Sequence, residues 1–214
     1  MAFLRIAIIF AIHAAWSASD ACAVVCQQET VGVDTSSANA EGYVASRCGE
    51  APGQTFVAER TRISSISVFR IAAQMPYGGH LKLWITQVDA TGRPLIASVL
   101  LDGPVITVPF GDGEHPIEMK FALDPPFELP APGQYYFAVQ DYCGGHWTFL
   151  GSDRDTYAEG HAWRSGITCF DGCYLREFMD SFEAIDLVFD IVFCSDVPTP
   201  ARARSWGALK IMYR

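Results

Sequence analysis

Short runs of β-branched and aromatic residues, separated by Gly, Pro and Asp, recur along the chain from Gln54 onward. Such runs, at a spacing of roughly 8–12 residues, are typical of strands in an antiparallel β-sandwich. The strands are expected at Gln54–Ala58, Ile63–Ala72, His80–Val88, Leu95–Leu101, Pro116–Ala122, Gln134–Gln140, Trp147–Leu150, Gly160–Ser165 and Leu187–Cys194. The best helix candidate is short, Leu175–Ala184, so the fold class is predicted to be all-β.

The N-terminal residues have the layout of a secretory signal peptide. Arg5 precedes an apolar run from Ile6 to Trp16, which small residues follow. The run is too short to span a bilayer as a mature helix. We expect a signal peptide at 1–23 with cleavage after Ala23; a second site follows Ser19, and a buried N-terminal helix is the alternative. The mature chain is therefore predicted to be exported, extracellular, periplasmic or at the cell surface, without a transmembrane segment.

Cysteine number agrees with export. The chain has 7 cysteines, and removal of Cys22 with the signal peptide leaves an even set, which in an exported protein indicates disulfides. Cys169 and Cys173 flank a tight turn, and Cys143 and Cys194 each end a strand-like run. The predicted pairs are Cys169–Cys173, Cys143–Cys194 and Cys26–Cys48. A zinc site with Cys143, His146, Cys169 and Cys173 as its four ligands is a competing interpretation.

Composition divides the rest of the chain and excludes some partners. Residues 24–52 are polar and small and are predicted to form an arm with a strand at Gly42–Ser46; 53–195 is the β-sandwich domain. The tail, 196–214, contains Pro198 and Pro200 and is basic. It is interpreted as a flexible end or a sorting signal. The net charge of −9 argues against nucleic acid and anionic lipid as partners.

The stretch G-S-D-R-D-T-Y-A-E-G-H-A-W-R-S-G, from Gly151 to Gly166, concentrates polar and aromatic groups. Asp153, Asp155 and Glu159 are candidate calcium ligands. EF-hand spacing fails, since Ala158 and Arg164 occupy the sixth and twelfth positions. A calcium site of another type and a solvated acidic loop both stay open, and no other cofactor is expected.

Aromatic rings that could stack on a sugar are the second kind of candidate. Tyr157, in the loop, is expected to be the best exposed ring. Trp163 and Trp147 are further candidates, with burial in the core as the alternative for each. Trp84 and Tyr174 are the remaining candidate rings. Trp84 lies in a strand that alternates apolar and polar residues, which favours a position in the core.

Three stretches together resemble the jelly-roll β-sandwich modules of secreted bacterial proteins, similar to carbohydrate-binding or galactose-binding-like domains. They are G-Q-T-F-V-A with I-S-S-I-S-V-F, then F-E-L-P-A-P-G-Q-Y-Y-F-A-V, then Y-A-E-G-H-A-W-R-S closed by L-V-F-D-I-V-F. The resemblance covers about residues 53–194 and implies fold better than function. The added cysteines depart from the pattern and indicate loops held by disulfides.

Catalytic motifs are missing from the sequence: it contains no G-x-S-x-G, H-E-x-x-H or P-loop. The mature histidines, His80, His115, His146 and His161, are scattered. The chain is predicted to be a non-catalytic binding module whose partner is a glycan or another cell-surface component. A structural or adhesive protein that binds another protein is the alternative, and a secreted hydrolase with a converging carboxylate pair is a third. The sequence carries no signal for oligomeric state.

Overall fold

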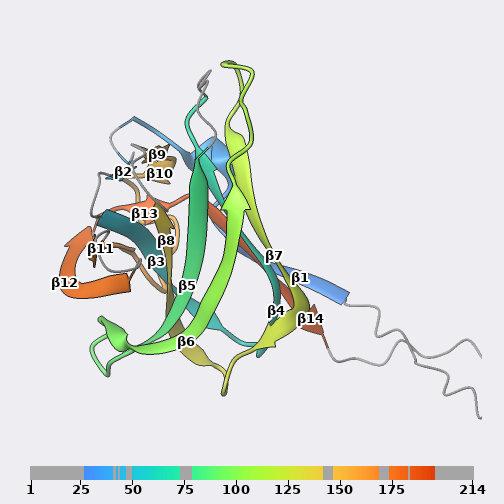
Figure 1. Cartoon of the computed structure of the whole chain (residues 1–214), viewed down its shortest axis with the longest axis vertical. Helices are drawn as coiled ribbons and strands as arrows, with labels where there is room; N and C mark the ends of the chain where they lie inside the picture. The colour runs from blue at the N-terminus through green and yellow to red at the C-terminus, as the bar shows by residue number, and fades with distance from the viewer. Residues whose placement is uncertain are drawn as a thin grey trace, which may run out of the picture. The chain divides into compact units, whose positions relative to one another are not determined.

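The computed structural model describes residues 27–40, 42, 44–46, 50–72, 79–141, 147–168, 174–182 and 184–195. These residues form antiparallel strands and one short 3-10 helix at Thr35–Ser37, with no α-helix among them (Figure 1). The prediction of an all-β chain is therefore confirmed. None of the described residues forms a helix that could span a membrane.

Two six-stranded sheets make up the described part of the chain, and we name them sheet A and sheet B. Sheet A contains β1 (Gln27–Gly32), β14 (Phe189–Ser195), β4 (Arg62–Arg70), β7 (Ile117–Glu128), β9 (Trp147–Phe149) and β2 (Val44–Ser46). Sheet B has the order β12 (Tyr174–Phe182), β11 (Ala162–Thr168), β3 (Glu50–Ala58), β8 (Gly133–Asp141), β5 (His80–Val88), β6 (Pro94–Thr107). A two-stranded ladder joins β10 (Gly151–Ser152) to β13 (Asp186–Leu187).

The main core lies between the two sheets and follows from strand alternation. On β8, Tyr135, Phe137 and Val139 lie two residues apart, so they share one face of the strand, and all three point into this core. Phe137 meets Phe189 of sheet A with ring centroids 5.5 Å apart, which brings the two sheets into direct contact. Burial of these side chains removes apolar area from water and so helps to hold the two sheets together.

The opposite face of sheet B is buried as well, around a second apolar cluster. Its buried members are Ala51, Trp84, Ile96, Tyr136 and Ala138. Sheet B curves so that its two edge strands, β12 and β6, come into contact. Figure 1 shows β5 and β6 as long, bent arrows. The curvature explains why residues on both sides of one sheet are shielded from water.

One predicted element is wrong. The segment Leu175–Ala184 is expected as a helix, but its residues up to Phe182 belong to β12, which pairs antiparallel with β11. Pairing with a neighbouring strand outweighs the modest helix propensity of a short segment. The expected arm also differs in detail, because β1 at its start pairs with β14 and so belongs to sheet A.

Most cysteine predictions fall outside the described residues. Cys26, Cys48, Cys143, Cys169 and Cys173 lie there, as do the signal peptide, His146 and the tail from 196. Cys194 is described: it is buried and disulfide-bonded. The identity of its partner, like the other two pairs, stays a prediction.

Candidate binding site

The loop from Asp153 to Glu159 is held against the sandwich by one buried carboxylate, that of Asp186 on β13. Its Oδ2 accepts hydrogen bonds from the backbone N–H groups of Thr156 and Tyr157, both at 2.9 Å. Its Oδ1 accepts from the side-chain amide of Gln54 at 2.9 Å, and that amide oxygen accepts from Leu187 N–H. Burial raises the pKa of Asp186, and these hydrogen bonds offset part of the rise.

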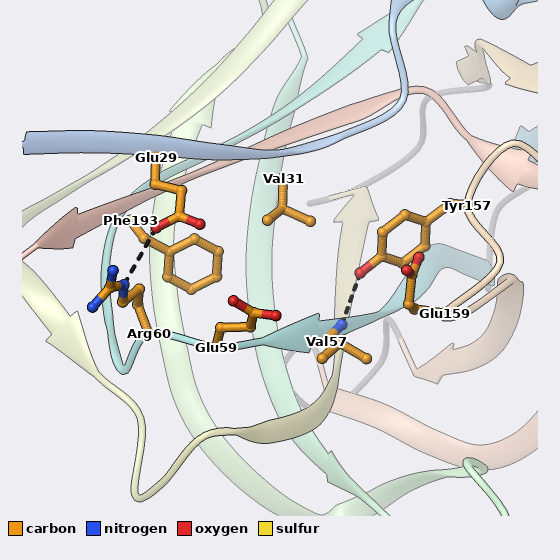
Figure 2. Close-up of a pocket in the computed structure, with 8 residues that line it drawn as sticks. All are labelled: Glu29, Val31, Val57, Glu59, Arg60, Tyr157, Glu159 and Phe193. Atoms are coloured by element: carbon orange, nitrogen blue, oxygen red, sulfur yellow. Dashed lines mark hydrogen bonds and ion pairs between the residues drawn. The ribbon is translucent and has the colours of Figure 1, made fainter.

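A pocket of about 220 Å³ opens beside this loop. Figure 2 shows its lining: Glu29 and Val31 from β1, Val57 from β3, Glu59 and Arg60 from the turn after β3, Tyr157 and Glu159 from the loop, and Phe193 from β14. Val31, Val57 and Phe193 give it an apolar wall. The pocket lies where the edge of sheet A approaches one end of β3.

Acidic groups dominate the polar part of the pocket. Arg60 pairs with Glu29, with Nε and Oε2 3.3 Å apart (Figure 2). Within the described residues, the carboxylates of Glu59 and Glu159 have no hydrogen bond or ion pair. Both are therefore free to accept hydrogen bonds from a ligand.

Tyr157 contributes a hydroxyl group to the same pocket. Its oxygen accepts from Val57 N–H at 2.9 Å, and its ring packs edge-on against Phe189 with centroids 5.3 Å apart. Burial raises the pKa of this hydroxyl, and the nearby carboxylates of Glu159 and Asp186 raise it further. The group is consequently protonated at neutral pH, and its proton is available for donation to a ligand.

The structure separates the residues predicted from the stretch Gly151–Gly166. Tyr157, expected as the best exposed ring, is instead 7% exposed and belongs to the main core; only its hydroxyl edge reaches the pocket. Asp153 accepts a hydrogen bond from the Asn39 amide at 2.6 Å, and Asp155 is exposed. Among the described residues no three His, Cys, Asp or Glu side chains gather as a metal site, so Asp153, Asp155 and Glu159 do not converge.

The tryptophan candidates lie elsewhere. Trp147 is buried in the main core with the Arg70 guanidinium 5.2 Å from its ring centroid. Trp84 is buried in the second cluster of sheet B, and Trp163 packs at the border of that cluster, stacked on His161 at 5.0 Å. The side chain of Tyr174 lies outside the described part of the chain.

Sequence reasoning missed most of the pocket. Glu29 falls in the expected arm, Glu59 and Arg60 fall between two expected strands, and Phe193 falls within the expected strand Leu187–Cys194. These residues are far apart in the chain and share no motif, so only the pairing of β1 with β14 and the position of the loop bring them together.

Comparisons with known proteins give a fold-level likeness. No family model matches the chain, and no curated protein matches it. One similar solved structure is that of the cysteine protease and lectin-like domains of Cwp84, a surface layer associated protein of Clostridium difficile. It is 11% identical, with a TM-score of 0.46, and the match covers 73% of this chain and 37% of that one.

A second solved structure is that of the clostridial cysteine protease Cwp84 after propeptide cleavage. It is 12% identical, with a TM-score of 0.50, and the match covers 78% of this chain and 40% of that chain. The present chain thus spans about two fifths of the length of these structures. At this identity the likeness concerns the fold alone.

Proposed function

We propose that this chain is a secreted, non-catalytic binding module of jelly-roll type that binds a glycan in the pocket between β1, β3 and the Asp153–Glu159 loop. One observation carries the proposal: the pocket combines an apolar wall with two unpaired carboxylates and a tyrosine hydroxyl. A volume of about 220 Å³ suits one sugar residue or the end of a chain.

The chemistry of the lining matches that of a sugar. Hydroxyl groups of a pyranose donate to carboxylates, and such charge-assisted hydrogen bonds are stronger than neutral ones. Glu59 and Glu159 supply the acceptors, and Tyr157 supplies a donor. The C–H face of the ring would lie against Val31 and Phe193, where removal of apolar area from water favours binding.

The likeness to Cwp84 supports this proposal at the level of fold. That protein is described as surface layer associated and as having a lectin-like domain. We extend these properties to the present chain as part of the proposal: an exported protein, outside the cell or at its surface, with disulfides that hold its loops.

The proposal is tested by glycan-array screening followed by calorimetric titration of the best ligand. Glu59→Gln and Glu159→Gln keep the shape of each side chain and remove its charge. Each variant replaces a charge-assisted hydrogen bond with a neutral one, a difference of about 1 kcal/mol, so each should bind about fivefold more weakly.

Glu114→Gln, on the exposed connection before β7, is the matched control and should bind like the original protein. Unchanged affinity in both pocket variants would contradict the proposal. Release of reducing sugar from a polysaccharide panel, lost in the same variants, would instead support the hydrolase.

A second candidate function, contact with another protein, is favoured by the outer edge of sheet B. On the edge strand β6, Leu95, Val99 and Val105 are exposed apolar side chains, and Phe110 beyond it is 71% exposed. Exposed edge strands are ready templates for pairing with another chain. If the partner is a second copy of this chain, the original protein should self-associate in sedimentation and Val99→Lys should not. A monomer in both proteins would contradict self-association through this edge.

A further inference from the structure

The pocket beside the Asp153–Glu159 loop carries an excess of negative charge. Among the described residues, its lining holds the carboxylates of Glu29, Glu59 and Glu159 against one cation, Arg60. Arg60 pairs with Glu29, and no ion pair compensates Glu59 or Glu159 within the same residues. The whole chain has a net charge of −9, so its remaining charges do not oppose this local field. The pocket therefore attracts a cationic ligand and repels an anionic one.

The carboxylates of the pocket do not meet at one point. Within the part of the chain that the structure describes, no three His, Cys, Asp or Glu side chains gather in a way that could hold a metal ion. Figure 2 shows Glu29 and Glu159 on opposite sides of the pocket, with Glu59 between them in this view. The pocket is therefore suited to a molecule that spans its acids rather than to a metal ion.

A buried hydroxyl group gives independent evidence of a ligand. Tyr157 is 7% exposed and lines the pocket, where its oxygen accepts from Val57 N–H at 2.9 Å. Among the described residues, no acceptor receives the proton of this hydroxyl. A polar group buried to this extent normally uses its hydrogen-bonding capacity, because an unmade bond costs free energy. The proton is consequently available to an oxygen atom of a ligand, such as a sugar hydroxyl.

The lining thus combines uncompensated carboxylates, a hydroxyl donor and the apolar wall described above. An ammonium group donates three hydrogen bonds and accepts none, so it suits the carboxylates of Glu59 and Glu159. A sugar ring that carries this ammonium presents C–H groups to the apolar wall and oxygen atoms to the Tyr157 hydroxyl. A sugar with a free amine therefore matches every part of the lining at once.

We propose that the pocket selects an amino sugar with a free amine, such as a glucosamine residue, over neutral and acidic sugars. This inference rests on the proposed function, since it names the class of glycan that the same pocket takes. The ammonium is held by Glu59 and Glu159, and the ring packs against the apolar wall. Acetylation of the amine removes its charge and weakens binding. A uronic acid is disfavoured, because its carboxylate meets the acids of the lining.

The test is a calorimetric titration of the full chain with a glucosamine trisaccharide, its N-acetylated form, sodium glucuronate and butylamine, all at equal ionic strength. The pH is held at about 6, where amines resembling the α-amino group, with a pKa of about 7.7–8.0, are protonated. The free-amine trisaccharide should bind about tenfold more tightly than the N-acetylated one, because it alone forms charge-assisted hydrogen bonds through its amine. Added sodium chloride should narrow this difference.

The two remaining probes separate the sugar from its charge. Glucuronate should not bind, because its charge has the wrong sign. Butylamine carries the ammonium of a lysine side chain without a sugar ring, and it should bind more weakly than the free-amine trisaccharide.

Single substitutions should move the preference for the free amine in opposite directions. Glu59→Gln and Glu159→Gln should each reduce it, because each removes a negative charge from the lining. Arg60→Gln releases Glu29 from its ion pair, so it should strengthen binding of the free-amine trisaccharide about twofold to fivefold. That pair is half-exposed, and its loss should leave the fold intact. Glu114→Gln is the control and should leave the preference unchanged.

The outcomes separate this inference from the proposed function. Equal or tighter binding of the N-acetylated trisaccharide or of glucuronate, weakened in Glu159→Gln, would overturn the amino-sugar inference and leave a glycan site in the pocket. Butylamine binding as tightly as the free-amine trisaccharide would also overturn it, in favour of a simple ammonium site. Failure of both trisaccharides to bind would overturn the inference, while the glycan array would still decide the proposed function.

Discussion

A single carboxylate, Asp186, determines the conformation of the loop that carries Tyr157 and Glu159. It is almost fully buried, yet both of its oxygens are hydrogen-bonded to donors from the loop and from Gln54. Burial of a charge is costly unless such partners are present. The acidic composition of Gly151–Gly166 does not reveal this hydrogen-bond network. Its central carboxylate, Asp186, lies in β13, 20 residues beyond the end of that stretch.

The raised pKa of Asp186 makes a prediction about pH. The folded state binds this proton more tightly than the unfolded chain, whose carboxyl has a pKa near 3.8. The contribution of this group to the free energy of unfolding is therefore largest below pH 3.8 and declines as pH rises through the folded pKa. Because asparagine does not titrate, the free energy of unfolding of the original protein minus that of Asp186→Asn should fall over this interval.

Urea denaturation at a series of pH values measures this difference. Asp155→Asn, an exposed carboxylate on the same loop, is the control and should change stability by less than about 0.5 kcal/mol. A difference that grows with pH would show that the hydrogen bonds to Asp186 outweigh its burial.

Among the elements, β3 and β8 show how sheet B buries both of its faces. On β8 the alternation sends Tyr135 and Phe137 to the main core and Tyr136 to the second cluster. The sequence predicts this division but not that both faces are covered. That outcome depends on the curvature that brings β12 against β6. The incorrect prediction of a helix at Leu175–Ala184 also has a cause in tertiary structure, because β12 is stabilised by its pairing with β11.

Gly53 lies in β3 at a position where an added side chain would overlap neighbouring atoms. A Cβ there would lie 2.0 Å from the Phe137 carbonyl oxygen and 2.6 Å from the Tyr136 ring. Gly53→Ala should therefore force β3 away from β8 and lower the free energy of unfolding by at least about 3 kcal/mol.

Gly92, in the turn between β5 and β6, provides the comparison. Its φ is +83°, but an added Cβ would meet only the Gln134 side chain. Gly92→Ala should cost about 1–2 kcal/mol, from backbone strain alone. Denaturant unfolding measures the loss of free energy of unfolding in Gly53→Ala and in Gly92→Ala. Equal losses would contradict the prediction that atomic overlap at Gly53 adds to the cost.

At the scale of the molecule, strand pairing joins the first and the last described segments of the chain. β1 pairs with β14, so these two segments lie side by side in sheet A. The buried, disulfide-bonded Cys194 lies in β14 at this position. A covalent link there restricts the unfolded chain and so stabilises the folded one.

Cys194→Ser should lower the free energy of unfolding by about 2–4 kcal/mol, the usual contribution of a native disulfide. Thermal unfolding with and without reductant measures the effect. Reduction of this bond should destabilise the original protein, whereas the variant has already lost the bond and its loss cannot lower its stability again. Alkylation of the unreduced, denatured protein followed by mass analysis provides the check. Labelling of Cys194 in every molecule would contradict the prediction.

The sequence by itself determined the all-β class, most strand positions and the shared face of Tyr135, Phe137 and Val139, because these depend on local residue preference and a period of two. It did not determine the curvature of sheet B, the strand at β12, or the meeting of Glu29, Glu59 and Glu159 at one pocket. Those features depend on strand pairing and packing between segments far apart in the chain. Tyr157 illustrates the division: its loop was evident from the residues, but its burial against Phe189 was decided by the tertiary structure.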